Sequence, residues 1–295
     1  EGKSLNDLLG DHEAAPYEGL PSYIWLLQAL KEEGVHYPYV AVAEYAPPAT
    51  AGDGPVHVNV TFSKFPITST RTHHTVGARS ILETVVGVDG HELTLFNNHW
   101  KSGASNPETE PIRVGNARVL RQRLNVIFEE NPKADVVVGG DLNSHYNQEV
   151  LFTDLDETAV YDVLGSRGDE LGIRGTGGQL LYNLWFDLPF EARGSELYRG
   201  QWGTLMKLVV SEGLYDFQGI QIIDNSFGVV RIPGLNEHPV TGAPLEWVGA
   251  GDGAGFSDHY PVVSRFRVVS DDDPYRYIQL SNPSRMDKGP VSLPE

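Results

Sequence analysis

Residues 56–63 alternate between apolar and polar side chains, which is the period of a β-strand with one buried face. The apolar positions are Val56, Val58, Val60 and Phe62, and the polar ones are His57, Asn59, Thr61 and Ser63. Shorter apolar runs predict further strands over residues 37–45, 134–144, 202–211 and 261–269. The run at 134–144 is expected to break at Gly139-Gly140, where glycine allows the backbone to approach a ligand closely.

Residues 80–100 form two apolar runs around Asp89-Gly90, which predicts a β-hairpin. Helices are predicted over residues 21–34 and 114–132. The first is expected to start at Ser22, to share a face among Trp25, Leu26 and Leu30, and to end at Gly34. The apolar stripe of the second consists of Ala117, Leu120, Leu124, Ile127 and Phe128, and Asn131-Pro132 stops it.

Many hairpin-linked strands with a few helices indicate an α+β protein, built from two stacked mixed or antiparallel sheets flanked by helices. Residues 150–200 are rich in Gly, Asp and aromatic residues and give no clear pattern. Residues 1–269 are interpreted as a single domain. Residues 270–295, with SDDDP and later prolines, are interpreted as an extended tail or linker.

Composition narrows the classes of function. The chain has 295 residues, a hydrophobic fraction of 40% and no cysteine, which excludes disulfides, thiol catalysis and cysteine zinc sites. No run reaches the ~18 apolar residues of a membrane span. A net charge of −18 argues against tight, non-specific binding of nucleic acid, although it also serves solubility alone. The chain begins at Glu1 rather than Met, and we interpret it as a mature or truncated piece.

Polar clusters follow three of the apolar runs. Asn98, His99 and Lys101 follow the hairpin, Asp141 and Asn143 follow the run at 134–144, and Asp258 and His259 precede the last run. Each cluster alone is more typical of a turn or a helix cap than of a catalytic site. Together they point to one polar hollow, provided that the strand ends converge.

The set NHWKS, GGDLNS and SDHYP, in this order, resembles the endonuclease/exonuclease/phosphatase superfamily, which has the deoxyribonuclease-I-like fold. FSKFPI at residues 62–67 supports the resemblance, which covers about residues 20–268 and is closest to secreted bacterial members. The resemblance implies a four-layer α/β/β/α sandwich and an extracellular or periplasmic location. It also implies hydrolysis of phosphoesters with a divalent ion, usually Mg²⁺, with Mn²⁺ or Ca²⁺ as alternatives.

The resemblance also implies the roles of the clustered residues. Asp141 would orient and activate the attacking water. His99, Asn143 and a protonated His259 would donate hydrogen bonds to the phosphoryl oxygens. Asp258 would hold or orient the metal, because Mg²⁺ prefers hard oxygen ligands. Residues expected to contact the substrate are Asn59, Asn98 and Lys101.

Two features depart from the pattern of the superfamily. In the superfamily, the metal-binding glutamate follows the second strand, and we assign this role to Glu1. The first strand is then missing from the chain. We expect an upstream segment or a partner chain to supply it. The superfamily also places an aspartate at the position of Met206, where it would fix the final histidine. Met206 cannot do so, and Lys207 beside it disfavours a protonated His259.

Three functions therefore stay open. The first is an extracellular nuclease or phosphodiesterase. The second is a phosphatase or a phosphodiesterase of phospholipid head groups, for which the aromatic residues of 181–190 would touch a membrane, although clustered aromatics more often pack in a core. Neither of these requires stable membrane insertion. The third is a degenerate binding or structural member of the fold, favoured by Met206 and the missing strand.

Overall fold

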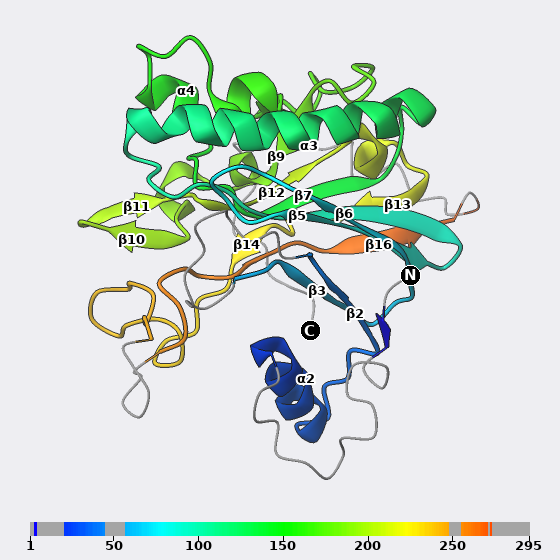
Figure 1. Ribbon diagram of the computed structural model, residues 1–295, viewed down its shortest axis with the longest axis horizontal. Helices are drawn as coiled ribbons and strands as arrows, with labels where there is room; N and C mark the ends of the chain where they lie inside the picture. Colours follow the sequence, from blue (N-terminus) through cyan, green and yellow to red (C-terminus); the bar gives the residue numbers. More distant parts are fainter. Residues whose placement is uncertain (1–2, 5–20, 45–56, 248–254, 271, 273–295) are drawn as a thin grey trace.

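The chain is described by a computed structural model that covers residues 3–4, 21–44, 57–247, 255–270 and 272. Helix α3 (Glu110–Glu130) covers one face of a seven-stranded sheet, and smaller sheets cover the other face. Helix α2 (Ser22–Glu32) packs outside one of these smaller sheets (Figure 1). The α+β class is confirmed. The predicted tail lies almost wholly outside the described residues.

The large sheet has the strand order β4-β5-β6-β7-β12-β9-β8. In that order its strands are Ile67–His73, Ile81–Val88, His91–His99, Val136–Asp141, Met206–Val210, Leu181–Asn183 and Ser166–Arg167. The pairs β6–β7 and β8–β9 are parallel, and the other neighbours are antiparallel. The sheet is therefore mixed, as predicted.

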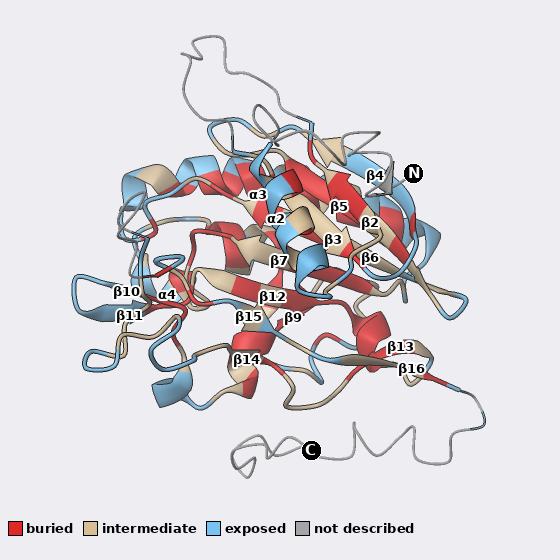
Figure 2. Cartoon of the chain, turned by 90° about the horizontal axis from the view of Figure 1, so that it is seen from below, coloured by how far each residue is buried: buried red, intermediate tan, exposed pale blue. Residues whose placement is uncertain are grey.

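Both faces of the large sheet are buried, which explains the unbroken apolar run at the start of β7. Val136 and Val138 point to α3, whereas Val137 points to the smaller sheets. The predicted stripe of α3 is confirmed, because all five of its residues lie in the same buried cluster as Val136 and Val138. Figure 2 shows buried residues concentrated along the central strands, with α3 alternating between buried and exposed positions.

Among the described residues, the layer opposite α3 consists of three separate antiparallel sheets rather than one. They are β1-β2-β3 (Lys3–Ser4, Tyr39–Val42 and Val60–Ser63), β13-β16 (Gly219–Ile222 and Phe266–Val269) and β14-β15 (Gly228–Val229 and Val262–Val263). The predicted strand at 56–63 forms only over Val60–Ser63, within the described residues from 57 onward. Its two faces are both covered, because Val60 and Phe62 pack toward α2 while Asn59 and Ser63 are buried as well. The prediction of a single buried face was wrong.

Helix α2 ends as predicted, with Gly34 in the left-handed region at φ 78°. Its buried face was predicted incorrectly, since Ile24 and Leu27 pack on β2 and β3 while Trp25 and Leu26 are exposed. We also expected no strand ahead of this helix. The two-residue strand β1 lies there and pairs antiparallel with β2.

The hairpin of β5 and β6 is confirmed, with Asp89 and Gly90 both at positive φ, as a tight hairpin turn requires. The expected break at Gly139-Gly140 does not occur, because β7 continues to Asp141. Residues 150–200, which gave no clear pattern, contain mostly short elements. The remaining elements of the fold are η2 Pro107–Thr109, α4 Gln148–Leu151, η3 Ala159–Val163, η4 Leu184–Asp187, η5 Phe190–Ala192, β10 Glu196–Tyr198, β11 Gln201–Gly203 and η6 Glu212–Tyr215.

A buried ionic cluster fastens α3 to the large sheet. Glu83 of β5 accepts hydrogen bonds from Arg123 of α3 at 2.7 and 2.9 Å, and pairs with His73 of β4 at 2.6 Å. Burial opposes ionisation of Glu83, but the hydrogen bonds from His73 and Arg123 outweigh it and lower the pKa of Glu83 to about 2. The ionised carboxylate therefore stabilises the folded state.

Glu83→Gln is expected to lower the free energy of unfolding at pH 7 by about 3 kcal/mol. Because the folded pKa lies below the ordinary value of 4.5, the wild-type advantage is complete above that value and is lost as pH falls toward about 2. Urea unfolding at pH 7 and pH 3 measures the difference. Glu157→Gln, which breaks the exposed Arg118–Glu157 pair, is the control and should cost less than about 1 kcal/mol. An equal cost for Glu83→Gln at both pH values would contradict this account.

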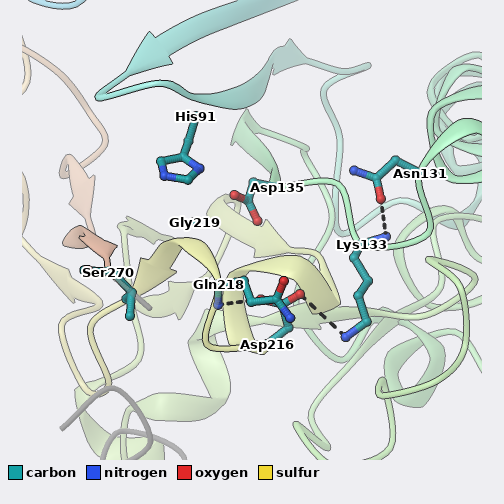
Figure 3. A pocket seen from close by; sticks show the side chains of 9 residues that line it. His91, Asn131, Lys133, Asp135, Asp216, Gln218, Gly219 and Ser270 are labelled. Atoms are coloured by element: carbon teal, nitrogen blue, oxygen red, sulfur yellow. Dashed lines mark hydrogen bonds and ion pairs between the residues drawn. The ribbon is translucent and has the colours of Figure 1, made fainter. Parts of the chain in front are cut away.

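A pocket of about 510 Å³ lies at the edge of the large sheet where β6 and β7 begin (Figure 3). His91 and Asp135 line it from these two strand starts, and Lys133 pairs with Asp216 across 3.5 Å. Asp135 accepts a hydrogen bond from the backbone N–H of Ile220 at 3.2 Å. Burial, with the nearby charge of Asp216, raises the pKa of Asp135 to about 7. The pocket therefore holds a carboxyl group that resists ionisation.

Asp135→Asn is expected to raise the melting temperature by a few degrees at pH 8, since Asn keeps the acceptor oxygen and removes the ionisation. The folded pKa is above the ordinary value of 3.8, so wild-type stability falls as pH rises from there to about 7. The difference between variant and wild type should therefore grow between pH 4 and pH 8 in thermal unfolding. A difference that stays constant with pH would overturn this assignment.

Candidate active site

The parallel pairing of β6 and β7 brings two of the predicted polar clusters together. His99 ends β6 and Asp141 ends β7, and the two residues are register partners. Their side chains approach to 3.5 Å between His99 Nε2 and Asp141 Oδ2. Strand β12 runs antiparallel to β7 and begins with Met206 directly opposite Asp141. One edge of the large sheet therefore carries the candidate site.

The turn after β7 fixes Asp141. Asn143 adopts the left-handed conformation with φ 46°, and its backbone N–H donates to Asp141 Oδ1 at 2.8 Å. The Asn143 side chain is buried and donates one amide hydrogen to the carbonyl of Trp100 at 3.2 Å. Gly140 is required here because a Cβ atom would lie 2.2 Å from the carbonyl oxygen of Asn98. The close approach that this glycine allows is to the neighbouring strand, whereas we had predicted a ligand.

The third cluster reaches the same edge through β10. His259 forms an isolated antiparallel β-bridge with Glu196, and the backbone N–H of Tyr260 donates to the Ser195 carbonyl at 2.6 Å. Nδ1 of His259 lies 3.0 Å from Oδ1 of Asp258, whose side chain is exposed. His259 is close enough to His99 to influence the pKa of that residue. The structure thus brings His99, Asp141 and His259 together from sequence-distant segments.

The pKa values of the two histidines are shifted in opposite directions. Burial lowers the pKa of His99; Asp141 opposes this, while Arg79, His259 and His57 reinforce it. Burial also disfavours protonation of His259, but the hydrogen bond with Asp258 and the nearby carboxylates outweigh it and raise the pKa of His259. Relative to an ordinary histidine, His99 therefore favours the neutral form and His259 the charged form.

The three residues predicted to contact the substrate do not all lie near the candidate site. Asn98 is not brought to the site: it is buried, donates to the carbonyls of Phe96 and Gly139, and accepts from the indole N–H of Trp100. Its side chain lies on the opposite face from its strand neighbour His99, because successive residues of a strand alternate.

The other two predicted contacts remain near the edge. Asn59 is buried and donates to the carbonyl of Ser80 at 2.8 Å, one residue from Arg79, whose N–H donates to the His99 carbonyl. Lys101 is partly buried, and its backbone N–H donates to Asn116 at 3.2 Å. Contact of either side chain with a substrate remains a prediction.

The glutamate expected after the second strand was predicted to be Glu1. Glu1 lies outside the described residues, so its assignment as a metal ligand remains untested. With β1 present, β2 is the second strand, and Glu44 lies two residues beyond its end at Val42. The exposed Glu44 carboxylate lies 3.9 Å from His74, which is 3.1 Å from Ser80. In the sequence, Glu44 is the single carboxylate of the apolar run YVAVAEY.

Lys207 has a different role from the one predicted. It is fully buried beside Met206, and its Nζ donates to the carbonyls of Ser144 and Thr204. Burial lowers the pKa of Lys207 to about 7, against the attraction of Glu196 and Asp141. The ammonium group ties the loop after β7 to the start of β12, and so supports the segment that carries Asn143.

The donor set suits a hard divalent ion. Among the described residues, no group of three or more His, Asp and Glu side chains is arranged to hold a metal. Mg²⁺ does not need such a cage, because it keeps several waters and binds through one or two carboxylates together with substrate phosphates. Asp141 and Asp258 supply carboxylates at this edge, with Asp258 exposed. These residues fit Mg²⁺ better than a metal that needs nitrogen or sulfur ligands.

The aromatic stretch at 181–190 belongs largely to the core. Tyr182 and Trp185 are fully buried, while Phe190 is exposed. This agrees with the core-packing interpretation rather than with a membrane loop. Within the described ranges, no helix has the length and apolar character needed to cross a bilayer.

Comparison with known proteins shows the family of the chain. No curated protein sequence matches the chain. Two structures of TDP2 from D. rerio, a humanized variant and a complex with a single-strand DNA product, each have a TM-score of 0.50, with 15% and 16% identity. Each alignment covers 84% of this chain and 82% of the other. The human nocturnin catalytic domain aligns at 0.48 and 14% identity over 83% and 76% of the two chains.

The likeness to these structures concerns the fold. The family assignment comes from a sequence profile described as "Endonuclease/Exonuclease/phosphatase family", which matches residues 55–267. That span contains the segments that carry His99, Asp141 and His259, and it exceeds half of the 295 residues. The chain belongs to the endonuclease/exonuclease/phosphatase family, whose members are metal-dependent phosphoester hydrolases.

Proposed function

We propose that the protein is a metal-dependent nuclease or phosphodiesterase that cleaves phosphoesters by attack of water. The observation that carries the proposal is the convergence of His99, Asp141 and His259 at one sheet edge, with 3.5 Å between His99 Nε2 and Asp141 Oδ2. A phosphoester needs a base for water and donors for the developing charge on its oxygens. The extracellular or periplasmic location implied by the resemblance remains part of this proposal.

The residues at this sheet edge each have a role in the proposed reaction. Asp141, held by the N–H of Asn143, orients the water and accepts its proton. His259, biased toward its cationic form, donates to a phosphoryl oxygen, and the less basic His99 supplies a neutral donor. The second amide hydrogen of Asn143 can serve the same oxygens, because only one is used by Trp100.

We assign the carboxylates of Asp258 and Glu44 to the metal. Glu1, which the sequence predicted as the glutamate ligand, is the alternative to Glu44. A bound Mg²⁺ would neutralise charge on the phosphoryl oxygens, and Mn²⁺ or Ca²⁺ offers the same oxygen-seeking chemistry. Because the Asp258 side chain is exposed, it can contact both the ion and the waters bound to it. Small phosphoesters are the second class of substrate, favoured by the net charge of −18, which repels polymeric nucleic acid.

Asp141→Asn is expected to lower kcat/KM by about 10²- to 10⁴-fold, because it removes the proton acceptor and keeps the shape. The measurement is hydrolysis of DNA, RNA and bis(4-nitrophenyl) phosphate with Mg²⁺. Asp162→Asn is the matched control, since Asp162 accepts from the backbone N–H of Thr158 much as Asp141 accepts from Asn143. Equal turnover by Asp141→Asn and wild type would reject the proposed role, and no turnover by the wild type on any phosphoester would favour a degenerate member.

Removal of divalent ions by a chelator is expected to abolish turnover, and Mg²⁺ should restore it. Mg²⁺ should also raise the melting temperature, because a ligand that binds only the folded state stabilises it. Asp258→Asn should reduce both responses and require roughly tenfold more Mg²⁺ for the same effect. Full activity in the presence of the chelator, or an unchanged Mg²⁺ response in Asp258→Asn, would refute these assignments.

A further inference from the structure

The pocket lined by His91 and Asp135 lies at the opposite end of strands β6 and β7 from the candidate active site (Figure 3). His91 begins β6 and Asp135 directly precedes β7, whereas His99 and Asp141 end the same two strands. Strand β6 has nine residues, so at about 3.3 Å per residue its two ends lie roughly 26 Å apart. The proposed reaction uses none of the side chains that line this pocket, and they need a separate explanation.

The pocket holds more negative than positive side-chain charge. Its titratable lining residues, within the part of the chain that the structure describes, are His91, Lys133, Asp135 and Asp216. The ammonium group of Lys133 pairs with Asp216 across 3.5 Å, and no described cation pairs with Asp135. With both carboxyl groups ionised and His91 neutral, these side chains carry two negative charges and one positive charge. The pocket therefore lacks one positive charge.

The carboxyl group of Asp135 is open to a further donor. The backbone N–H of Ile220 donates to its Oδ2, whereas its Oδ1 accepts no hydrogen bond from a described residue. In Figure 3, Asp135 lies between His91 and Asp216, and the Lys133 ammonium points to Asp216. The space beside Asp135 is kept free by Gly219, where a Cβ atom would lie 3.1 Å from His91 Nδ1 and 3.4 Å from Asp135 Oδ2.

Burial makes a positive partner favourable here. Burial and the charge of Asp216 raise the pKa of Asp135 to about 7, and burial also raises the pKa of Asp216. A positive charge beside such a carboxyl group stabilises its anion. An anionic ligand would face two carboxyl groups. A metal ion needs several ligands at once, and the described residues contain no group of three or more His, Asp and Glu side chains arranged to hold one.

We propose that this pocket is a binding site for a small organic cation, whose ammonium or guanidinium group pairs with Asp135. The volume of about 510 Å³ is that of a small-molecule site, for which roughly 300–1,000 Å³ is usual. Val269 and the ring of His91 border the pocket and can contact the carbon chain of the ligand. The proposal does not depend on the hydrolase function.

Binding is measured by NMR titration at pH 8 with n-butylammonium and methylguanidinium, and with n-butanol as the uncharged match. The amide resonances of Gly219 and Ile220 are the readout, because both residues lie beside Asp135. Either cation should shift them saturably, and n-butanol should not. Asp135→Asn should weaken binding roughly tenfold or more, because it removes the charged hydrogen-bond acceptor. The control is Asp169→Asn, which alters a carboxylate that accepts from the N–H of Leu171 outside the pocket.

Lys133→Met gives a readout of opposite sign. It removes the positive charge that repels a cationic ligand, so it should tighten binding of either cation. If the pocket instead accepts an anion, the same change should weaken binding of inorganic phosphate. This variant also decides the question if Asp135→Asn does not fold.

Binding should also depend on pH, because the cation competes with the proton of Asp135. Since the folded pKa is about 7, affinity should be full above that value and fall about tenfold per pH unit below it. The other titratable groups that face Asp135 are His91, Lys133 and Asp216. The titration is therefore repeated in His91→Asn and Asp216→Asn, and the loss of affinity at acidic pH should persist in both.

Three results would overturn the proposal: no saturable shift with either cation, equal shifts with n-butanol, or unchanged binding in Asp135→Asn. Weaker binding of both cations to Lys133→Met would also overturn it. Tighter binding of Mg²⁺, Ca²⁺ or Zn²⁺ at the same amides would identify a metal site, and phosphate binding that Lys133→Met weakens would identify an anion site; both would reject an organic cation. None of these measurements uses turnover, so their failure leaves the hydrolase proposal unaffected.

Discussion

The in-register parallel pairing of β6 and β7 is the constraint on which the site depends. It places His99 opposite Asp141, and a slip of one residue would send either side chain to the other face of the sheet. The valines of β7 hold the register, because Val136 and Val138 fill the interface with α3 while Val137 fills the opposite one. The chemistry at the strand ends is thus positioned by apolar packing along their length.

Burial changes the protonation behaviour of the ionisable residues at this edge of the sheet. Burial lowers the pKa of His99, whereas at His259 the hydrogen bond with Asp258 and the nearby carboxylates outweigh burial and raise the pKa. The same desolvation makes each unpaired charge costly, so Lys207 is capped by two carbonyls and Glu196 by a hydroxyl and an N–H. A site built in this way keeps its groups in place before a substrate arrives.

Local patterns in the sequence were enough for elements whose signals are complete within the segment. The turn at Asp89-Gly90 and the stripe of α3 are of this kind. Sequence patterns failed where the burial of a residue depends on a neighbouring layer of the fold. Asn59 is polar yet buried, because β3 lies between α2 and the large sheet. Glu44 was given no role, because β1 has only two residues and leaves no periodic signal, so the run at 37–45 was not counted as the second strand.

The candidate site shows the same limit at the level of single side chains. The polar ends of apolar runs identified His99, Asp141 and His259, but no spacing along the chain links Glu196 to a histidine 63 residues later in the printed sequence. Only the bridge between β10 and the segment before β15 makes them neighbours. Met206 suggested a weakened site because it occupies the position where a carboxylate was expected. Although burial disfavours the charged imidazole of His259, the hydrogen bond with Asp258 and the nearby carboxylates still raise its pKa, so its charged form is favoured without a carboxylate on β12.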